Sequence, residues 1–155
     1  MCADTPLRIE AISVGKQRFL PLLLVGDESE EMIGRYLGRS VLYVAFSGDT
    51  PVAVCAVTDE GPGLVEVKNL AVDAAWRRRG IGRAMLAHVE HEYAGSDIVL
   101  GTGETPSTLR FYRSCGFVET HRIPDFFTTH YATTIVEEGI TLRDMIRLRK
   151  STSSR

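Results

Sequence analysis

The sequence predicts a fold of the α/β or α+β class, built around a mixed central sheet. Residues 41–57 contain two runs rich in β-branched and aromatic residues with a short turn between them, which is typical of a β-hairpin. Residues 64–101 then give a strand, a helix and a second strand, the order of a parallel β–α–β unit. With 155 residues, 44% hydrophobic and 25% charged, the chain is expected to form one soluble domain over residues 1–155.

The N-terminal part is expected to hold one strand and two short helices. Residues 7–14 alternate well enough for a first strand, and residues 17–24 suit a short helix that Pro21 interrupts or bends. Ser29 is a good helix cap with two glutamates in the turn after it, and Gly38 is expected to end this second helix.

Three strands are expected to follow as an antiparallel meander. Residues 41–46 and 52–57 form the predicted hairpin around a turn at residues 47–50. A glycine-rich turn at residues 61–63 then leads into a third strand over residues 64–72. The meander therefore ends in the strand that opens the parallel unit.

The helix of the parallel unit is the most regular segment of the chain. Ile81, Met85, Val89 and Tyr93 fall four residues apart, which gives an amphipathic helix with one buried stripe. The apolar residues 98–100 form a short strand after it. A strand, a helix and a strand of this length imply a right-handed crossover.

One more helix and two more strands complete the predicted fold. Thr105 is a suitable cap, Pro106 suits the first helical position, and Gly116 is the expected stop. Residues 117–119 and 142–148 are then predicted to be two strands separated by a loop.

The most informative segment lies between the strand at residues 64–72 and the helix that follows it. Residues 77–82 are Arg-Arg-Arg-Gly-Ile-Gly, and a further arginine stands at position 83. Glycines at the start of a helix let the backbone approach a ligand closely, and the unpaired N–H groups there favour a phosphate. Because the arginines add matching positive charge, this turn is predicted to hold a diphosphate.

Charge and hydropathy argue against several kinds of partner. The formal net charge is −2, so the arginines form a local patch on a mildly acidic protein, and no nucleic-acid partner is expected. No run of about 18 apolar residues is present and the N-terminus lacks the regions of a signal peptide, so we expect no membrane partner and a cytoplasmic location. The polar ends, residues 1–6 and 151–155, are expected to fray.

The cysteines and histidines give no sign of a metal site or a disulfide framework. Cys2, Cys55 and Cys115 are odd in number and far apart, which favours free thiols in a reducing compartment. His88 and His91 lie three residues apart, but no third ligand has metal spacing. No metal cofactor is therefore expected.

Three strings stand in a characteristic order within residues 64–118. They are Asn69-Leu70-Ala71-Val72-Asp73, then Arg77-x-x-Gly80-x-Gly82, and then Phe111-Tyr112-Arg113-Ser114-Cys115-Gly116-Phe117. Together they resemble the GNAT superfamily of acetyl-coenzyme A-dependent N-acetyltransferases, and the tail is similar to a branch of small bacterial members. The resemblance implies a largely antiparallel sheet of about six to seven strands around the parallel core, with helices on both faces. It also implies acetyl-coenzyme A (acetyl-CoA) as co-substrate.

The resemblance further implies which residues hold the cofactor. The main chain of Leu70, Ala71 and Val72 would hydrogen-bond the pantetheine arm beside the thioester. The diphosphate would lie on the arginine-rich turn, which consists of Arg77, Arg78, Arg79, Gly80, Ile81, Gly82 and Arg83. Thr105 stands where many members carry an asparagine that meets the cofactor. Alternatively, Thr105 only caps the helix and Ser107 supplies the hydroxyl contact.

Tyr112 aligns with the tyrosine that protonates the departing thiolate in many members. A phenol with a pKa of about 10 stays protonated at neutral pH, so it can donate to a sulfur whose thiol pKa is roughly 8.5. The alternative is an aromatic side chain that only packs on one face of a helix. The neighbouring Gly116 and Phe117 favour the catalytic role.

Glu66 aligns with a strand glutamate that serves as general base in some members. An amine with a pKa of about 10.4 is neutral in only about one of a few thousand molecules at pH 7, a deficit of roughly 4–5 kcal/mol. A group that accepts its proton is therefore needed. Glu66 and Lys68 lie on the same face of a strand, however, so an ordinary ion pair is an equal alternative.

The acceptor is expected to be a primary amine on a small molecule or peptide, acetylated by direct attack in a ternary complex. Residues 122–140 supply candidates for part of its wall, although they suit a cover for the sheet edge as well. These candidates are Asp125, Phe126, Phe127, His130, Tyr131, Glu137 and Glu138. Two other functions stay open: a non-catalytic sensor of CoA or acyl-CoA, and a nucleic-acid module. A homodimer is compatible with the resemblance.

Overall fold

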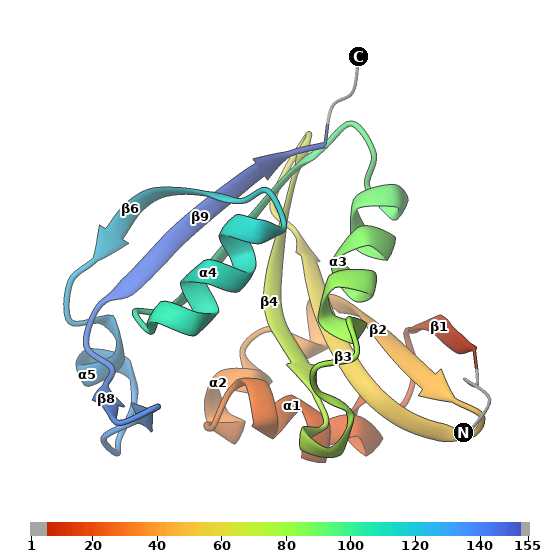
Figure 1. The fold of residues 1–155 in the computed structure, drawn as a ribbon, viewed down its shortest axis with the longest axis horizontal. Coiled ribbons are helices and arrows are strands. Elements are labelled where there is room, and N and C mark those ends of the chain that lie inside the picture. The colour runs from red at the N-terminus through yellow and green to blue at the C-terminus, as the bar shows by residue number, and fades with distance from the viewer. Residues whose placement is uncertain (1–5, 153–155) are drawn as a thin grey trace.

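The computed structural model describes residues 6–152 and is built on a seven-stranded sheet (Figure 1). The strand order is β1-β2-β3-β4-β5-β9-β6, and among the described residues β4 and β5 form the single parallel pair. The strands are β1 (Leu7–Ile12), β2 (Ser40–Ser47), β3 (Thr50–Asp59), β4 (Leu64–Val72), β5 (Asp97–Gly103), β6 (Val118–Ile123) and β9 (Met145–Ser151). The predicted fold class, with its largely antiparallel sheet and parallel core, is confirmed.

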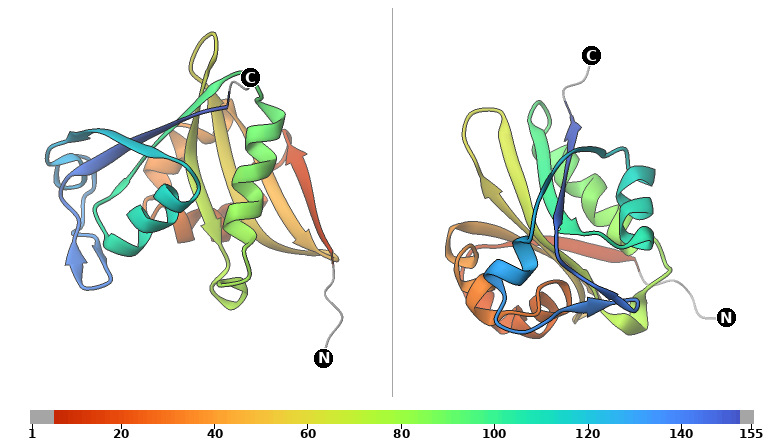
Figure 2. Two further views of the ribbon diagram at one scale, coloured as in Figure 1. Left: turned by 45° about the horizontal axis from the view of Figure 1, so that its top comes forward. Right: turned by 90° about the vertical axis from the view of Figure 1, so that its left-hand side faces the viewer.

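Helices cover both faces of the sheet (Figure 1, Figure 2). On one face lie α3 (Ile81–Glu92) and α4 (Pro106–Ser114), whose apolar side chains share a core with the sheet. On the other face lie α1 (Leu20–Gly26) and α2 (Glu30–Gly34), with a core of their own. The sheet is therefore covered on both sides, and a ligand that reaches its backbone must enter where strands or helices part.

The parallel pair β4–β5 opens partway along its length. The register ends with Val67 opposite Leu100, although β4 continues to Val72 and β5 to Gly103. β5 remains paired with β9 along this stretch. The two strands thus diverge, and within the described residues the β4 backbone beyond Val67 has no strand beside it on the β5 side.

A β-bulge lies in β4 where the two strands part. Pairing with β3 passes from Val67 to Asn69 without a partner for Lys68, so Lys68 is the extra residue. The bulge reverses which side chains face which core: Val67 packs under α3, whereas Ala71 packs against the α1 side. Glu66, before the bulge, therefore shares a face with Ala71, after it.

Two helix boundaries differ from the prediction for local reasons. The second helix ends at Gly34 and not at Gly38, because the backbone changes to i→i−3 bonding and continues as the 3₁₀ turn η2 (Leu37–Arg39). Pro21 does not bend a helix. It lies in the first turn of α1, after the 3₁₀ helix η1 (Lys16–Phe19), where its missing N–H costs no hydrogen bond. The cap at Ser29 is confirmed, since its Oγ accepts from the Met32 N–H at 3.2 Å.

The region between the last two strands of the large sheet is more regular than the predicted loop. It holds the short helix α5 (Phe126–His130) and a hairpin of β7 (Val136–Glu137) and β8 (Ile140–Thr141). A small apolar cluster of Phe127, Ile135 and Leu142 holds these elements together. Elements of five and two residues are too short to give a periodic signal in the sequence.

Part of the C-terminal segment that was expected to fray is held in place. Ser151 belongs to β9, and the Thr152 N–H donates to the Ser96 carbonyl at 3.2 Å. Among the other residues of that prediction, residues 1–5, which include Cys2, and residues 153–155 lie outside the described residues. None of the helices within residues 6–152 is long and apolar enough to span a membrane.

Candidate active site

The arginine-rich turn connects β4 to α3 with two residues in the left-handed region. Gly80 precedes the first residue of α3 with a φ of 77°, and Arg78 has a φ of 65°. Glycine adopts such angles without strain, whereas a residue with a side chain pays about 1–3 kcal/mol for them. This backbone path exposes the first N–H groups of α3, which have no partner within the helix.

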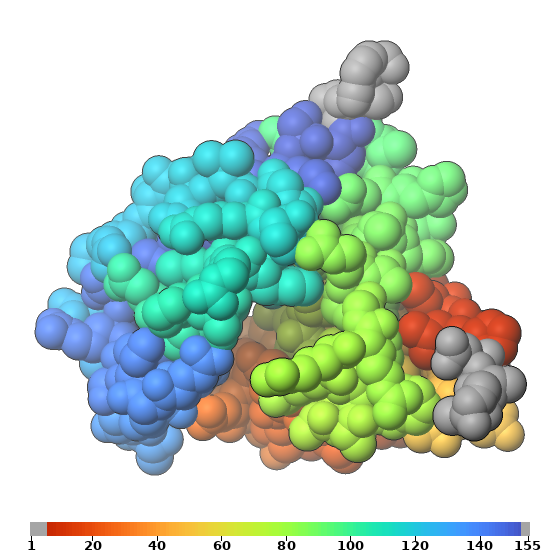
Figure 3. Space-filling view, in the orientation of Figure 1, coloured from red at the N-terminus to blue at the C-terminus, as the bar shows by residue number. Residues whose placement is uncertain are grey.

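A groove of about 520 Å³ lies in front of these N–H groups. Figure 3 shows this face of the molecule hollowed between α4 and the turn that follows β4. The groove is bordered by Val25, Leu70, Ala71, Val72, Trp76, Arg77, Arg78, Gly80, Ile81, Gly82, Arg83, Ser107, Thr108, Phe111 and Tyr112. Three of these residues are arginines and none is a carboxylate, so the groove suits an anion.

Tyr112 reaches the groove from α4. Its ring packs edge to face against Phe111 and Phe117, with centroids 5.1 and 5.8 Å away. Among residues 6–152 its hydroxyl makes no hydrogen bond. Burial, followed by the nearby thiols of Cys55 and Cys115, raises the pKa of Tyr112 well above its usual value. The phenol therefore keeps its proton at neutral pH and has it free to donate.

A second cavity, of about 170 Å³, borders the same strand at its bulge. On the sheet it touches residues 66–68 of β4 and 101–103 of β5, the point where the two strands part. Its other walls come from the end of α1, from α2 and from the region of α5 to β8. The bordering residues there are Gly26, Asp27, Met32, Tyr36, Phe126, Phe127, Tyr131, Glu137 and Leu142, together with Met145.

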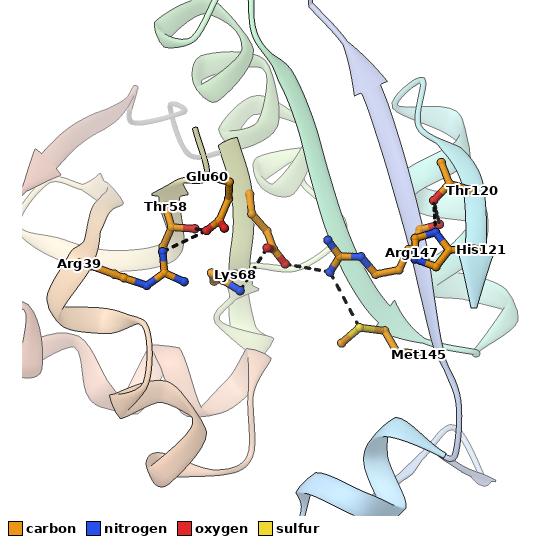
Figure 4. Close-up of polar contacts among 9 residues, drawn as sticks. Arg39, Thr58, Glu60, Lys68, Thr120, His121, Met145 and Arg147 are labelled. Carbon is orange, nitrogen blue, oxygen red and sulfur yellow. Dashed lines mark hydrogen bonds and ion pairs between the residues drawn. The ribbon is translucent and has the colours of Figure 1, made fainter. Parts of the chain in front are cut away.

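Glu66 borders this second cavity and lies between two cations. Figure 4 labels both cations, Lys68 and Arg147, with dashed lines that mark their polar contacts. Lys68 Nζ lies 3.1 Å from Glu66 Oε1, and Arg147 Nη1 donates to Oε2 at 2.8 Å. The ion pair with Lys68 that the sequence offered as an alternative is therefore present. Arg147 adds a partner from β9, and the side chain of Glu66 is only 12% exposed.

Asp27 lies just after α1 and accepts three hydrogen bonds. The donors are the Ser29 N–H at 3.2 Å, the Tyr36 hydroxyl at 3.3 Å and the Tyr131 hydroxyl at 2.8 Å. Burial raises the pKa of both phenols, so both remain neutral donors. The Tyr131 bond joins α5 to the end of α1 and closes one side of the second cavity.

The comparison with known families decides what kind of protein carries this site. Residues 38–119 match the acetyltransferase (GNAT) domain family. The chain belongs to the GNAT acetyltransferases. It is 34% identical over 146 residues to the uncharacterized N-acetyltransferase YvbK of Bacillus subtilis (strain 168). The matched region covers 92% of this chain and 94% of that protein.

Solved structures agree with this GNAT identification. An IAA acetyltransferase from Bacillus cereus ATCC 14579 has a TM-score of 0.87 and 35% identity, covering 94% of this chain and 99% of that one. A GNAT family acetyltransferase from Elizabethkingia anophelis, solved with acetyl-CoA bound, has a TM-score of 0.88 and 29% identity, covering 96% and 99%. The predicted superfamily is therefore confirmed, and the protein is an acetyltransferase.

Most of the predicted cofactor residues of this GNAT acetyltransferase border the groove. They are Leu70, Ala71, Val72, Arg77, Arg78, Gly80, Ile81, Gly82, Arg83, Ser107 and Tyr112. Arg79 does not border the groove, and its guanidinium lies over the Trp76 ring, 4.6 Å from the ring centroid. Glu66 borders the second cavity instead, so the predicted acid and base face different cavities.

Thr105 and Ser107 differ in how they relate to the groove. Thr105 occupies the cap position of α4, but its side chain makes no capping bond because it is turned into the interior, 1% exposed. Its Oγ1 has no hydrogen-bond partner among the described residues, and Thr105 does not border the groove. Ser107 does border it, and its hydroxyl donates to the Glu138 carboxylate.

Sequence reasoning did not find Asp27, Tyr36 or Arg147. Asp27 follows a helix end, where a polar residue is ordinary, and Arg147 alternates with buried neighbours as any outward strand residue does. Nothing local distinguishes them, because their partners lie far away in the chain. Residues 6–152 contain no cluster of side chains that fits a metal ion.

Proposed function

We propose that this GNAT acetyltransferase moves the acetyl group of acetyl-CoA to a primary amine by direct attack in a ternary complex. The supporting observation is the pair of cavities beside β4, the cationic groove at residues 70–72 and the second cavity at residues 66–68. Two substrates can approach one point of the strand from different sides, so no acetylated enzyme is needed.

The groove fits the chemistry of acetyl-CoA. The N–H groups of the turn and the side chains of Arg77, Arg78 and Arg83 would hold the diphosphate. Among the described residues, the β4 backbone beyond Val67 lacks a partner strand on the β5 side, so the amide groups that face this side have no ladder partner and could bond the pantetheine arm. The Val72 carbonyl already accepts from Arg77 Nε at 3.3 Å. Acetyl-CoA supplies a thioester whose carbonyl carbon accepts the amine nitrogen while the C–S bond breaks.

Glu66 is placed to receive the proton of the acceptor ammonium, directly or through water. It faces the second cavity and not the groove, which is the side an acceptor would occupy. Lys68 and Arg147 add positive charge beside it, which disfavours a protonated amine at this point. The residues around Glu66 thus favour the neutral amine that attacks.

Tyr112 gives its phenolic proton to the departing sulfur, so the leaving group is a neutral thiol. After the attack, the amine nitrogen loses a proton to solvent. Solvent in turn returns a proton to the Tyr112 phenolate, so the protons balance. Tyr112 suits this role because it borders the groove and its hydroxyl has no hydrogen-bond partner among the described residues. A reaction inside the cell is supported by Cys55 and Cys115, both buried and both free.

The test is release of free thiol from acetyl-CoA in the presence of a panel of primary amines, with product masses checked for one added acetyl group. The proposal predicts amine-dependent thiol release and acetylated amine in equal amounts. If CoA raises Tm while no amine is acetylated, the protein is a sensor of the cofactor and the proposal is wrong.

A further inference from the structure

The second cavity is electrically polarised. At its β4 end, Glu66 lies between Lys68 and Arg147, and one carboxylate between two cations leaves a net positive charge. An ammonium group is disfavoured there, and a neutral amine is not. The charge of the other walls has the opposite sign.

Asp27 contributes a carboxylate that forms no ion pair with any cation of residues 6–152. Its three hydrogen bonds come from a backbone N–H and from the neutral hydroxyls of Tyr36 and Tyr131. Tyr36 is itself held by the Asn69 amide, whose Nδ2 lies 3.0 Å from its hydroxyl. This arrangement fixes the position of the carboxylate and leaves its charge uncompensated within the described residues.

Glu137 contributes a second carboxylate, from β7. It borders the cavity, is half-buried, and forms no hydrogen bond or ion pair of its side chain within residues 6–152. Burial, then the nearby carboxylates of Glu28 and Glu138, raises the pKa of Glu137. Burying such a group without a partner costs free energy, which a cationic ligand would recover.

The remaining walls suit an alkyl chain. The rings of Phe127 and Tyr131 lie side by side with centroids 5.5 Å apart, and Phe126 and Met145 also border the cavity. Aromatic faces attract both aliphatic carbon and cations. A cavity of about 170 Å³ is smaller than those that enclose drug-sized ligands, so a short acceptor fits it best.

We infer that the acceptor is a short aliphatic amine with a second cationic group. The reacting amine lies uncharged beside Glu66, and the distal ammonium lies beside Asp27 and Glu137. This inference rests on the proposed function and narrows its substrate class. A carboxylate in place of the distal ammonium would be repelled by Asp27 and Glu137. An uncharged end would leave the charge of Asp27 without a cation and the side chain of Glu137 without a hydrogen-bond partner.

The kinetic test compares 1,4-diaminobutane with n-pentylamine, in which a methyl group replaces the second ammonium. We expect kcat/KM to be about tenfold or more higher for the diamine, the ratio that about 1.4 kcal/mol of transition-state binding gives. Asp27→Asn and Glu137→Gln should each bring this ratio close to one. Glu31→Gln, whose side chain is 83% exposed on α2, is the matched control and should keep the ratio.

Calorimetry separates this inference from the proposed function. Binding of 1,4-diaminobutane is measured on protein saturated with CoA, where no acetyl transfer occurs, and should weaken about tenfold in Asp27→Asn and Glu137→Gln. Absence of turnover with every amine contradicts the proposed function, and the diamine calorimetry then decides the inference alone. Equal binding of diamine and pentylamine, or preference for 5-aminopentanoate, overturns the inference.

Discussion

Arg147 reaches Glu66 across the backbone of β5, with Nη1 2.8 Å from Oε2. The crossing point is Gly101, where a Cβ atom would lie 2.9 Å from that same nitrogen. A side chain at this position would therefore push the guanidinium away. The absence of a side chain at Gly101 thus lets β9 supply a charge to a carboxylate on β4, with β5 between them.

The pair of Glu66 and Arg147 should contribute measurably to stability, because both side chains are largely buried, 12% and 18% exposed. Arg147→Met should lower the free energy of unfolding by about 2 kcal/mol, since Glu66 keeps Lys68 but loses a charged hydrogen bond. In a double-mutant cycle with Glu66→Gln, denaturant unfolding should give a coupling of about 1–3 kcal/mol. Arg149→Met removes a 49% exposed arginine from the same strand and should change stability much less. A coupling near zero would show that the two side chains act independently.

Tyr112→Phe should lower kcat by about a hundredfold, because the ring still packs while the proton donor is lost. Affinity for CoA, measured by calorimetry, should stay nearly the same. Since the pKa of Tyr112 is raised, wild-type kcat should show no loss from its ionisation up to about pH 10. Tyr93→Phe, which removes a phenol that bonds Tyr43 outside the site, is the control. An unaltered kcat in Tyr112→Phe removes this residue from the chemistry.

Glu137→Gln should stabilise the protein at neutral pH and have no such effect in acid. The raised pKa of Glu137 means that the folded protein holds this proton more tightly than the unfolded chain. The stability that the proton gives is complete below the unfolded pKa of about 4.3 and is lost as pH rises through the folded value. The Tm difference between Glu137→Gln and wild type should therefore grow from pH 4 to pH 7. For Glu31→Gln, the Tm difference from wild type should not grow with pH. A Tm difference for Glu137→Gln that stays constant from pH 4 to pH 7 would mean that the folded protein does not disfavour the ionised form of Glu137.

The predicted elements that held were those with a long pattern. The helix from Ile81 has a four-residue apolar repeat, and the strand over residues 64–72 is a nine-residue run that starts directly after a glycine-rich turn. Both appear almost as predicted. The turn between them could be predicted because glycine lets the backbone approach a ligand closely and arginine adds the positive charge that a phosphate needs. The helix α5 and the hairpin of β7 and β8 escaped prediction because they are short and are held by contacts among themselves.

The candidate site divides in the same way. Tyr112 and the arginine-rich turn each belong to a short motif. The residues around them in the structure are therefore largely the residues beside them in the sequence. The surroundings of Glu66 depend on Arg147, which is 81 positions away, and those of Asp27 on Tyr131, 104 positions away. No local pattern records such a contact, and only the sheet order and the path of the chain create it.

The most direct test of the account is calorimetric titration of CoA into the wild-type protein and into Gly82→Val. A Cβ at Gly82 would lie 3.2 Å from Phe111 Cζ, so the larger side chain should fill the groove at the start of α3. Gly34→Val, on a helix where a Cβ would meet nothing within 4 Å, is the control for the substitution itself. We predict that CoA binds the wild type and Gly34→Val alike, and binds folded Gly82→Val at least about tenfold more weakly. No heat with the wild type, or equal affinity in Gly82→Val, would contradict the account.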